Sequence, residues 1–149
     1  MKKIIFILVS CLLATSMLTV SCGSDNNNPA PDPNLPVPDP EGTISLSFYY
    51  GNSEHSLLPN GTVYMYNGRF NTINSLGRFI SVGQVAGLGN ITKIPENGQW
   101  VDYISIFEGC GYILQAGGLY CRIYVESVTV NSAGNVNTAL IKYQSPFNP

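Results

Sequence analysis

The stretch that decides the fold of this chain is residues 111–125, GYILQAGGLYCRIYV. Apolar and polar residues alternate on both sides of Gly117-Gly118, a pair suited to the two-residue turn of a β-hairpin. With the turn there, three pairs lie opposite each other and point to one face: Leu114–Cys121, Tyr112–Ile123 and Cys110–Val125. The opposite face receives Ile113, Gln115, Tyr120, Arg122 and Tyr124. The apolar face of this hairpin is therefore expected to lie on a core.

The rest of residues 43–149 also reads as short strands separated by turns. No window shows sustained apolar recurrence at three and four residues, so helix is not favoured anywhere. Besides the hairpin, the expected strands are residues 44–50, 63–66, 79–85, 90–94, 100–107 and 139–143, with a tight turn at Asn67-Gly68 and a turn and loop over 51–61. Beyond Glu126 the apolar phase shifts to Val128 and Val130, which indicates a bulge. About seven strands predict an all-β domain, a small antiparallel sandwich or barrel.

Residues 22–42, ahead of this domain, read as a tether. A polar run is followed by prolines at positions 29, 31, 33, 36, 38 and 40. Proline fixes φ and lacks a backbone donor, so the stretch suits neither a helix nor a central strand. An extended spacer of about 12 residues reaches about 37 Å. Recognition of the PxxP pattern by a partner is the alternative.

Residues 1–21 read as an export signal that ends at Cys22. A basic start is followed by an apolar run of about 17 residues, too short for an ordinary membrane span. Residues 18–22, LTVSC, resemble the bacterial lipobox, whose cysteine is lipidated and becomes the new N-terminus, although Thr19 stands where leucine is usual. A competing match ends at Cys11 but leaves a very short apolar core. Cys22 is the predicted lipidation site; a cleaved secretory signal with an incidental cysteine is the alternative.

The charge balance argues against nucleic-acid binding. Without residues 1–21 the chain keeps five basic against nine acidic residues, a net charge of −4, and after Gly42 five of each sign remain. A nucleic-acid binder needs a basic footprint, and the sequence shows none. Few charges and nine tyrosines are typical of an extracytoplasmic β protein.

Several segments of the domain resemble one family. Residues 111–114 (GYIL), 120–125 (YCRIYV) and 141–147 (IKYQSPF) are similar to the C-terminal pattern of a family of small lipoproteins from anaerobic gut Gram-negative bacteria, and residues 87–95 (GLGNITKIP) resemble another part of it. The likeness covers most of the domain. It implies a cell-envelope lipoprotein and brings no catalytic residues with it. Cys110 and Cys121 depart from the family pattern, so the resemblance implies no shared disulfide.

No group of residues in the sequence points to catalysis or to a metal. His55 is the only histidine, is expected in a solvated loop, and cannot supply the several ligands that zinc requires. Gly87-x-Gly89 does not precede a helix, so it fails the context test for a nucleotide loop. The domain acids are scattered, and nothing pairs two of them as a glycosidase needs: Glu54, Glu96, Asp102, Glu108 and Glu126. We expect no enzyme activity and no cofactor.

Cys110 and Cys121 are expected to be buried thiols. In the hairpin register Cys121 faces Leu114, which lies roughly 13 Å along the strand from Cys110. A disulfide needs Cα atoms within about 7 Å. Export to an oxidising compartment favours the opposite outcome.

Outward tyrosines supply the candidate binding residues. Five tyrosines fall on the less apolar phase of their strands: Tyr49, Tyr64, Tyr66, Tyr120 and Tyr124. Tyr120, Arg122 and Tyr124 form a row on the outer face of the hairpin, and this row is the predicted ligand-binding site, with Arg122 held flat by cation–π contact. The alternative is that a loop or another strand covers the row and makes it a second small core.

These features predict a non-enzymatic, lipid-anchored protein of the cell envelope. We expect it in the outer membrane, exposed at the surface, as a module that binds a glycan or another envelope protein. A structural or accessory subunit of an envelope assembly is the alternative. The expected partners are the membrane, through the N-terminal lipid, and such a glycan or protein, but not nucleic acid.

Overall fold

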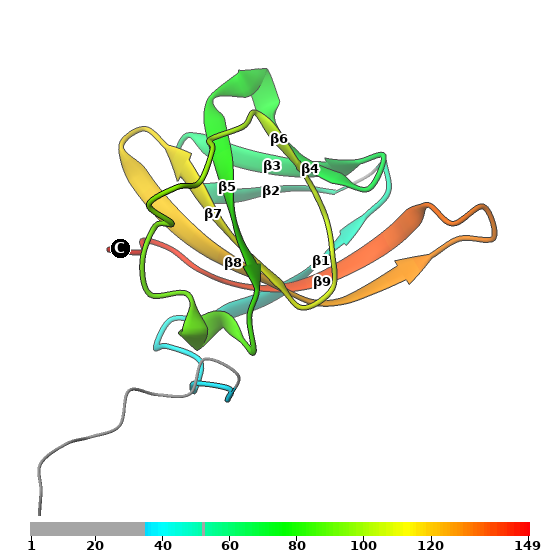
Figure 1. Ribbon diagram of the computed structural model, residues 1–149. Helices are drawn as coiled ribbons and strands as arrows, with labels where there is room; N and C mark the ends of the chain where they lie inside the picture. Colours follow the sequence, from blue (N-terminus) through cyan, green and yellow to red (C-terminus); the bar gives the residue numbers. More distant parts are fainter. Residues whose placement is uncertain (1–34, 52) are drawn as a thin grey trace, which may run out of the picture. The chain divides into compact units, whose positions relative to one another are not determined.

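Two antiparallel sheets form the domain in this computed structural model, which describes residues 35–51 and 53–149 (Figure 1). The five-stranded sheet has the order β1 (Ile44–Tyr49), β9 (Val136–Gln144), β8 (Leu119–Val130), β7 (Cys110–Ala116) and β5 (Gly77–Gln84). The four-stranded sheet has the order β2 (Glu54–Leu58), β3 (Gly61–Tyr66), β4 (Arg69–Thr72) and β6 (Tyr103–Ser105). The described residues also form two 3-10 turns, η1 (Ile73–Ser75) and η2 (Leu88–Asn90). The predicted all-β antiparallel fold is confirmed, as a sandwich.

The β7–β8 hairpin has the predicted register. Tyr112 pairs with Ile123, and Leu114 pairs with Cys121. Gly117 and Gly118 have φ values of 58° and 79°, both in the left-handed region that a tight hairpin turn of this kind requires. The predicted turn at Asn67-Gly68 joins β3 to β4, and the predicted bulge in β8 appears as a register shift between Val125 and Ser127.

The described residues form nine strands, where the sequence predicted about seven. Two expectations about other segments are wrong. Residues 54–58 form strand β2 rather than a loop, because Glu54 and His55 pair with β3 although their sequence does not alternate. Residues 90–94 form no strand; they leave η2 and continue as a loop towards Pro95.

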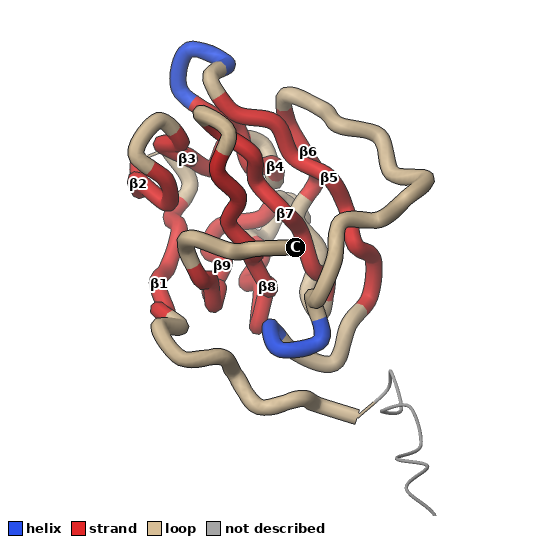
Figure 2. The backbone as a smooth tube through the Cα atoms, turned by 90° about the vertical axis from the view of Figure 1, so that its left-hand side faces the viewer, coloured by secondary structure: helices blue, strands red, loops and turns tan. Residues whose placement is uncertain are grey.

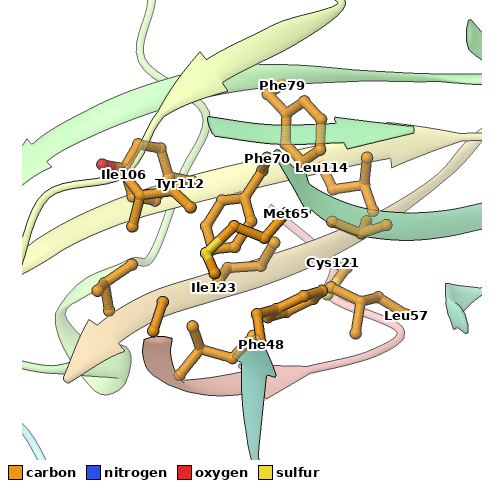
Figure 3. Packing of buried hydrophobic residues seen from close by; sticks show 14 of the residues in the cluster. Phe48, Leu57, Met65, Phe70, Phe79, Ile106, Tyr112, Leu114, Cys121 and Ile123 are labelled. Carbon is orange, nitrogen blue, oxygen red and sulfur yellow. The ribbon is translucent and has the colours of Figure 1, made fainter. Parts of the chain in front are cut away.

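The main core lies between the two sheets, which both contribute side chains to it (Figure 3). Phe70 of β4 lies at its centre, with ring centroids 5.2 Å from Phe48 and 6.0 Å from Tyr112. The Tyr112 hydroxyl donates to the Ser105 carbonyl at 2.9 Å and accepts from the Phe107 N–H at 3.0 Å. The core is thereby joined to the edge strand of the four-stranded sheet.

Cys110 and Cys121 are both buried and form no disulfide, as predicted. Cys121 is fully buried among apolar side chains on the core face of β8. This burial raises the pKa of the Cys121 thiol far above its usual value, because the thiolate would lose its hydration. The Cys121 thiol is therefore protected from reaction in the folded protein.

A second apolar cluster covers the outer face of the five-stranded sheet. Ile80 and Ile113 point outward from β5 and β7 and pack with Leu88, Ile91 and Phe147. Figure 2 shows the C-terminal segment crossing this face, where the Phe147 N–H donates to the Tyr120 carbonyl at 2.8 Å. The outer face of this sheet is therefore a second small core.

The last part of the predicted tether lies on the domain. The Asn90 side chain donates to the Leu35 carbonyl at 3.0 Å and accepts from the Val37 N–H at 3.1 Å. Asp39 forms an ion pair with Lys142 at 3.0 Å, and the carboxylates of Glu126 and Asp39 raise the pKa of Lys142. Residues 35–41 therefore belong to the folded domain, whereas Cys22 and the signal segment lie outside the described residues.

A glycine allows this close approach of the tether. A Cβ atom at Gly89 would lie 2.7 Å from the Val37 carbonyl oxygen and closer still to that of Pro38. At Gly87, two residues earlier, a Cβ would make only ordinary contacts, with Asn90 Oδ1 at 3.8 Å. Within the part of the chain that the structure describes, no helix is long and apolar enough to cross a membrane.

Candidate functional site

The predicted row of Tyr120, Arg122 and Tyr124 is partly covered rather than open. Tyr120 and Tyr124 pack against the second cluster, and Tyr120 lies 6.3 Å from the Trp100 ring. The covering segments are the loop after β5 and the C-terminal residues, which the sequence offered only as the alternative. The row therefore does not form the open aromatic platform that was expected. A ligand-binding role for these residues stays a prediction.

Arg122 is occupied by contacts within the protein. Its Nε donates to Gln144 Oε1 at 2.8 Å, and a terminal nitrogen donates to the Ile91 carbonyl at 2.7 Å. Its guanidinium carbon lies 4.9 Å from the centroid of the Phe147 ring, so the cation–π partner is Phe147 rather than a tyrosine of the row. Partial burial lowers the pKa of Arg122. These contacts join four segments of the chain.

The outer face of the four-stranded sheet has a different character. Its alternate residues Val63, Met65 and Phe70 point into the core, so their neighbours point outward. We call the outward set the tyrosine face; it consists of Glu54, Ser56, Thr62, Tyr64, Tyr66, Arg69, Asn71, Tyr103 and Ser105. Tyr66 is 51% exposed and Tyr103 is 54% exposed, so this face keeps two open aromatic side chains.

The strand register arranges the tyrosine face in cross-strand rows. Glu54 lies opposite Tyr64, Tyr64 opposite Asn71, and Asn71 opposite Tyr103, which places one residue from each strand in line. The neighbouring row consists of Tyr66, Arg69 and Ser105. Side chains directly opposite in antiparallel strands have Cβ atoms about 4.5–5.5 Å apart. The face is therefore a continuous surface of phenol rings and polar groups.

Two hollows adjoin the tyrosine face. One, of about 530 Å³, lies beside Glu54, Tyr64 and Tyr66, and the ring of Tyr66 stacks on that of Tyr50 at 5.9 Å. The other, of about 520 Å³, runs along β6, and we call it the β6 groove. Its lining includes Arg69, Ser81, Gln99, Tyr103, Ser105 and Phe107.

The β6 groove lies at the edge of the sandwich where β5 and the segment before β6 share one backbone bridge. Phe79 of β5 and Val101 exchange two backbone hydrogen bonds of 2.8 Å. Beyond this bridge β5 pairs only with β7, and β6 pairs only with β4, among the described residues. The groove follows the seam that remains between the two edge strands.

Arg69 is the cation of the β6 groove. Its guanidinium carbon lies 4.9 Å from the centroid of the Tyr103 ring. Three other basic side chains of the domain have acidic partners: Arg78 with Asp102, Lys93 with Glu96, and Lys142 with Asp39 and Glu126. No described carboxylate lies within 4.0 Å of Arg69, so its charge faces the groove without an acidic partner.

Sequence reasoning found part of this surface and missed the rest. Tyr64 and Tyr66 were identified as outward tyrosines, because β3 alternates clearly. Arg69 and Asn71 join the surface through the β3–β4 hairpin, but the sequence predicted no strand at residues 69–72. Tyr103 joins it only through the β4–β6 pairing of segments more than thirty residues apart. No local pattern of residues could have indicated that pairing.

His55 is not the solvated loop residue that was expected. It lies on β2, half-buried, with its ring 4.8 Å from that of Phe48 in an edge-on contact. Its Nε2 is 3.2 Å from the Ser47 carbonyl oxygen. Within residues 35–51 and 53–149, no three His, Cys, Asp or Glu side chains come together as a metal site would require.

Comparisons with known proteins show a structural similarity but no family. No protein-family model matches the chain, and no curated protein matches it. Among solved structures, the chain is similar to a protein of Bacteroides fragilis described as a "putative lipoprotein", with 12% identity and a TM-score of 0.42. The similarity covers 72% of this chain and 90% of that one. At these values it assigns the chain to no family.

Proposed function

We propose that this protein is a non-enzymatic lipoprotein of the bacterial cell envelope that binds a glycan on its tyrosine face. The lipobox-like segment before Cys22 supports the anchor, and the proline-rich segment after it supports a domain held away from the lipid. The outer membrane is the proposed location, with the domain at the cell surface.

The difference between the two outer faces is the observation that carries the binding proposal. The five-stranded sheet has its outer face closed by a second apolar cluster, whereas the four-stranded sheet keeps Tyr66 and Tyr103 about half exposed. Phenol rings stack on the apolar faces of sugar rings, and neighbouring amides and hydroxyls bind sugar hydroxyls. Asn71, Thr62 and Ser105 supply such groups on this face.

A glycan array tests the binding proposal directly. The full chain, purified in detergent, should bind a defined set of glycans, and Tyr66→Ser combined with Tyr103→Ser should abolish that binding with little change in melting temperature. Tyr49→Ser, which removes another exposed tyrosine outside this face, is the control and should bind normally. Absence of binding to every glycan, together with specific capture of one envelope protein, would contradict the proposal.

The anchor is tested by replacing Cys22. We expect the wild-type protein to sediment with outer membranes. Cys22→Ala should not be acylated and should leave the membrane fraction, because the residue to which the lipid would be attached is gone. Two or more acyl chains hold a protein stably, whereas one is marginal. Mass spectrometry of the N-terminal peptide should show acylated Cys22. Unchanged outer-membrane partition of Cys22→Ala, with the same mass at its N-terminus, would mean that another anchor exists.

A structural subunit of an envelope assembly remains the second candidate, and one observation favours it. The β8–β9 hairpin projects beyond the other strands (Figure 1), and residues 129–135 around its tip are exposed. Val130 near the tip is 62% exposed. A projecting hairpin with an exposed valine beside a polar turn suits contact with a neighbouring subunit, and deletion of the turn would then disrupt assembly without affecting glycan binding.

A further inference from the structure

The β6 groove combines aromatic rings with a single cation in a way that indicates a particular kind of sugar. Tyr103 is 54% exposed and Phe107 is 61% exposed, and both line the groove. Both exposed rings belong to one groove, and an apolar surface rimmed by polar residues can mark a ligand-binding groove. Two rings in one groove offer stacking surfaces for adjacent sugar units of a chain.

Arg69 indicates that the ligand of the groove carries a negative charge. Its guanidinium lies against the Tyr103 ring at 4.9 Å, which limits its motion and leaves its donors available to the groove. Arg69 is the one charged side chain in the described lining of the groove, and no described acid lies within 4.0 Å of it. A carboxylate of the ligand would receive two parallel hydrogen bonds from such a fork.

We propose that the β6 groove binds a glycan that contains hexuronic acid, with the sugar carboxylate on Arg69 and the sugar rings against Tyr103 and Phe107. Ser81, Gln99 and Ser105 line the same groove and provide hydroxyl and amide groups for the neutral hydroxyls of the chain. This inference rests on the proposed glycan-binding function and adds the ligand class and the recognising residue.

The test compares acidic glycans with uncharged forms of the same glycans. Oligogalacturonate, alginate and hyaluronan oligosaccharides are each measured with the full chain in detergent by calorimetry, beside the same oligosaccharides after methyl esterification of their carboxyl groups. At least one acidic form should bind, and its methyl ester should bind at least about tenfold more weakly, since a hydrogen-bonded charge contributes that much.

Substitutions then show which side chains of the groove contact the glycan. Arg69→Gln should weaken binding of the acidic form about tenfold or more and leave the weak binding of the ester unchanged. Arg69→Lys should recover only part of the affinity, because lysine lacks the planar fork. Phe107→Ser should weaken both forms. Arg78→Gln, which removes a surface arginine paired with Asp102, is the matched control and should change neither.

The possible failures are distinguishable. Equal binding of acid and ester, or wild-type affinity of Arg69→Gln, would overturn the acidic ligand while the glycan-binding function stands. Failure of all three acidic oligosaccharides to bind would also overturn it; neutral glycans that bind on the array would then keep the broader function. If the folded protein binds no glycan of either kind, both proposals are wrong.

Discussion

Tyr112 joins the core to the seam beside the β6 groove. Its ring is 1% exposed, and its hydroxyl makes hydrogen bonds with the backbone on both sides of Ile106. Loss of hydration on burial raises the pKa of Tyr112 far above its usual value, and the hydrogen bond from Phe107 only partly opposes this. The folded protein therefore requires a neutral phenol at this position.

This burial predicts a loss of stability at alkaline pH. In the unfolded chain Tyr112 ionises near pH 10 and Cys121 near pH 9, whereas in the folded protein both stay neutral. The unfolded state thus binds fewer protons, and the free energy of unfolding falls as pH rises above about 9, by up to about 1.4 kcal/mol per pH unit for each group. Denaturant unfolding at several pH values between 7 and 11 measures this decrease in the free energy of unfolding.

Tyr112→Phe should flatten this pH dependence. The variant should be less stable at pH 7 by about 1–3 kcal/mol, because the Phe107 N–H loses its buried acceptor. Between pH 10 and pH 11 it should lose less stability than the wild type. Tyr49→Phe, which removes a hydroxyl from an exposed ring, is the control for the substitution itself. An equally steep decline in Tyr112→Phe would contradict the assignment.

The β7–β8 hairpin was predictable because its information is local. Period-two alternation and a Gly117-Gly118 turn determine its register without reference to any other segment. Strand β2 was missed because only Leu57 and Leu58 are buried in it, so its sequence has no alternation, and its identity depends on pairing with β3. The tyrosine face also depends on strand pairing. Its residues come together through the β2–β3 and β3–β4 hairpins and through the pairing of β4 with the distant β6.

The outer row of β8 is expected to contribute to stability. Tyr120 and Tyr124 pack with Trp100 and the second cluster, so Tyr120→Ser combined with Tyr124→Ser should lower the melting temperature by about 5–10 °C or more. The single variant Tyr49→Ser, at an exposed site, should lower it by far less. A double variant that melts within about 1 °C of the wild type would show that the covering segments add no stability.

At the scale of the whole molecule, the folded domain includes more of the proline-rich N-terminal segment than the composition of that segment indicates. Prolines at 36, 38 and 40 read as spacer, yet residues 35–41 form hydrogen bonds and an ion pair with the domain. Sequence could not show this, because the partners Asn90, Lys142 and Gln144 lie 53 to 103 residues away from their contacts in the tether. Proline-rich composition excludes regular pairing but not docking through side chains.

Gly89→Ala should release this segment. A Cβ at residue 89 would collide with the carbonyl oxygens of Val37 and Pro38, which are backbone atoms that cannot rotate away. We expect the protease Glu-C to cleave after Glu41 much faster in Gly89→Ala than in the wild type, as mass spectrometry of the fragments would show. Gly87→Ala lies in the same loop with room for a methyl group and should cleave like the wild type. Equal cleavage of all three would contradict docking.

With the lipid that we propose on Cys22, docking of residues 35–41 would set how far the domain can lie from its anchor. Twelve residues, 23–34, lie between Cys22 and Leu35. Covalent geometry limits such a leash to about 40 Å, and every further docked residue would shorten it by about 3.5 Å. A copy anchored and exposed as we propose would therefore reach only a small hemisphere around its anchor, where a ligand displayed on the same surface would meet it at a high effective concentration. Weak intrinsic affinity would suffice there, and polymers beyond that radius would be out of range until they reach the surface.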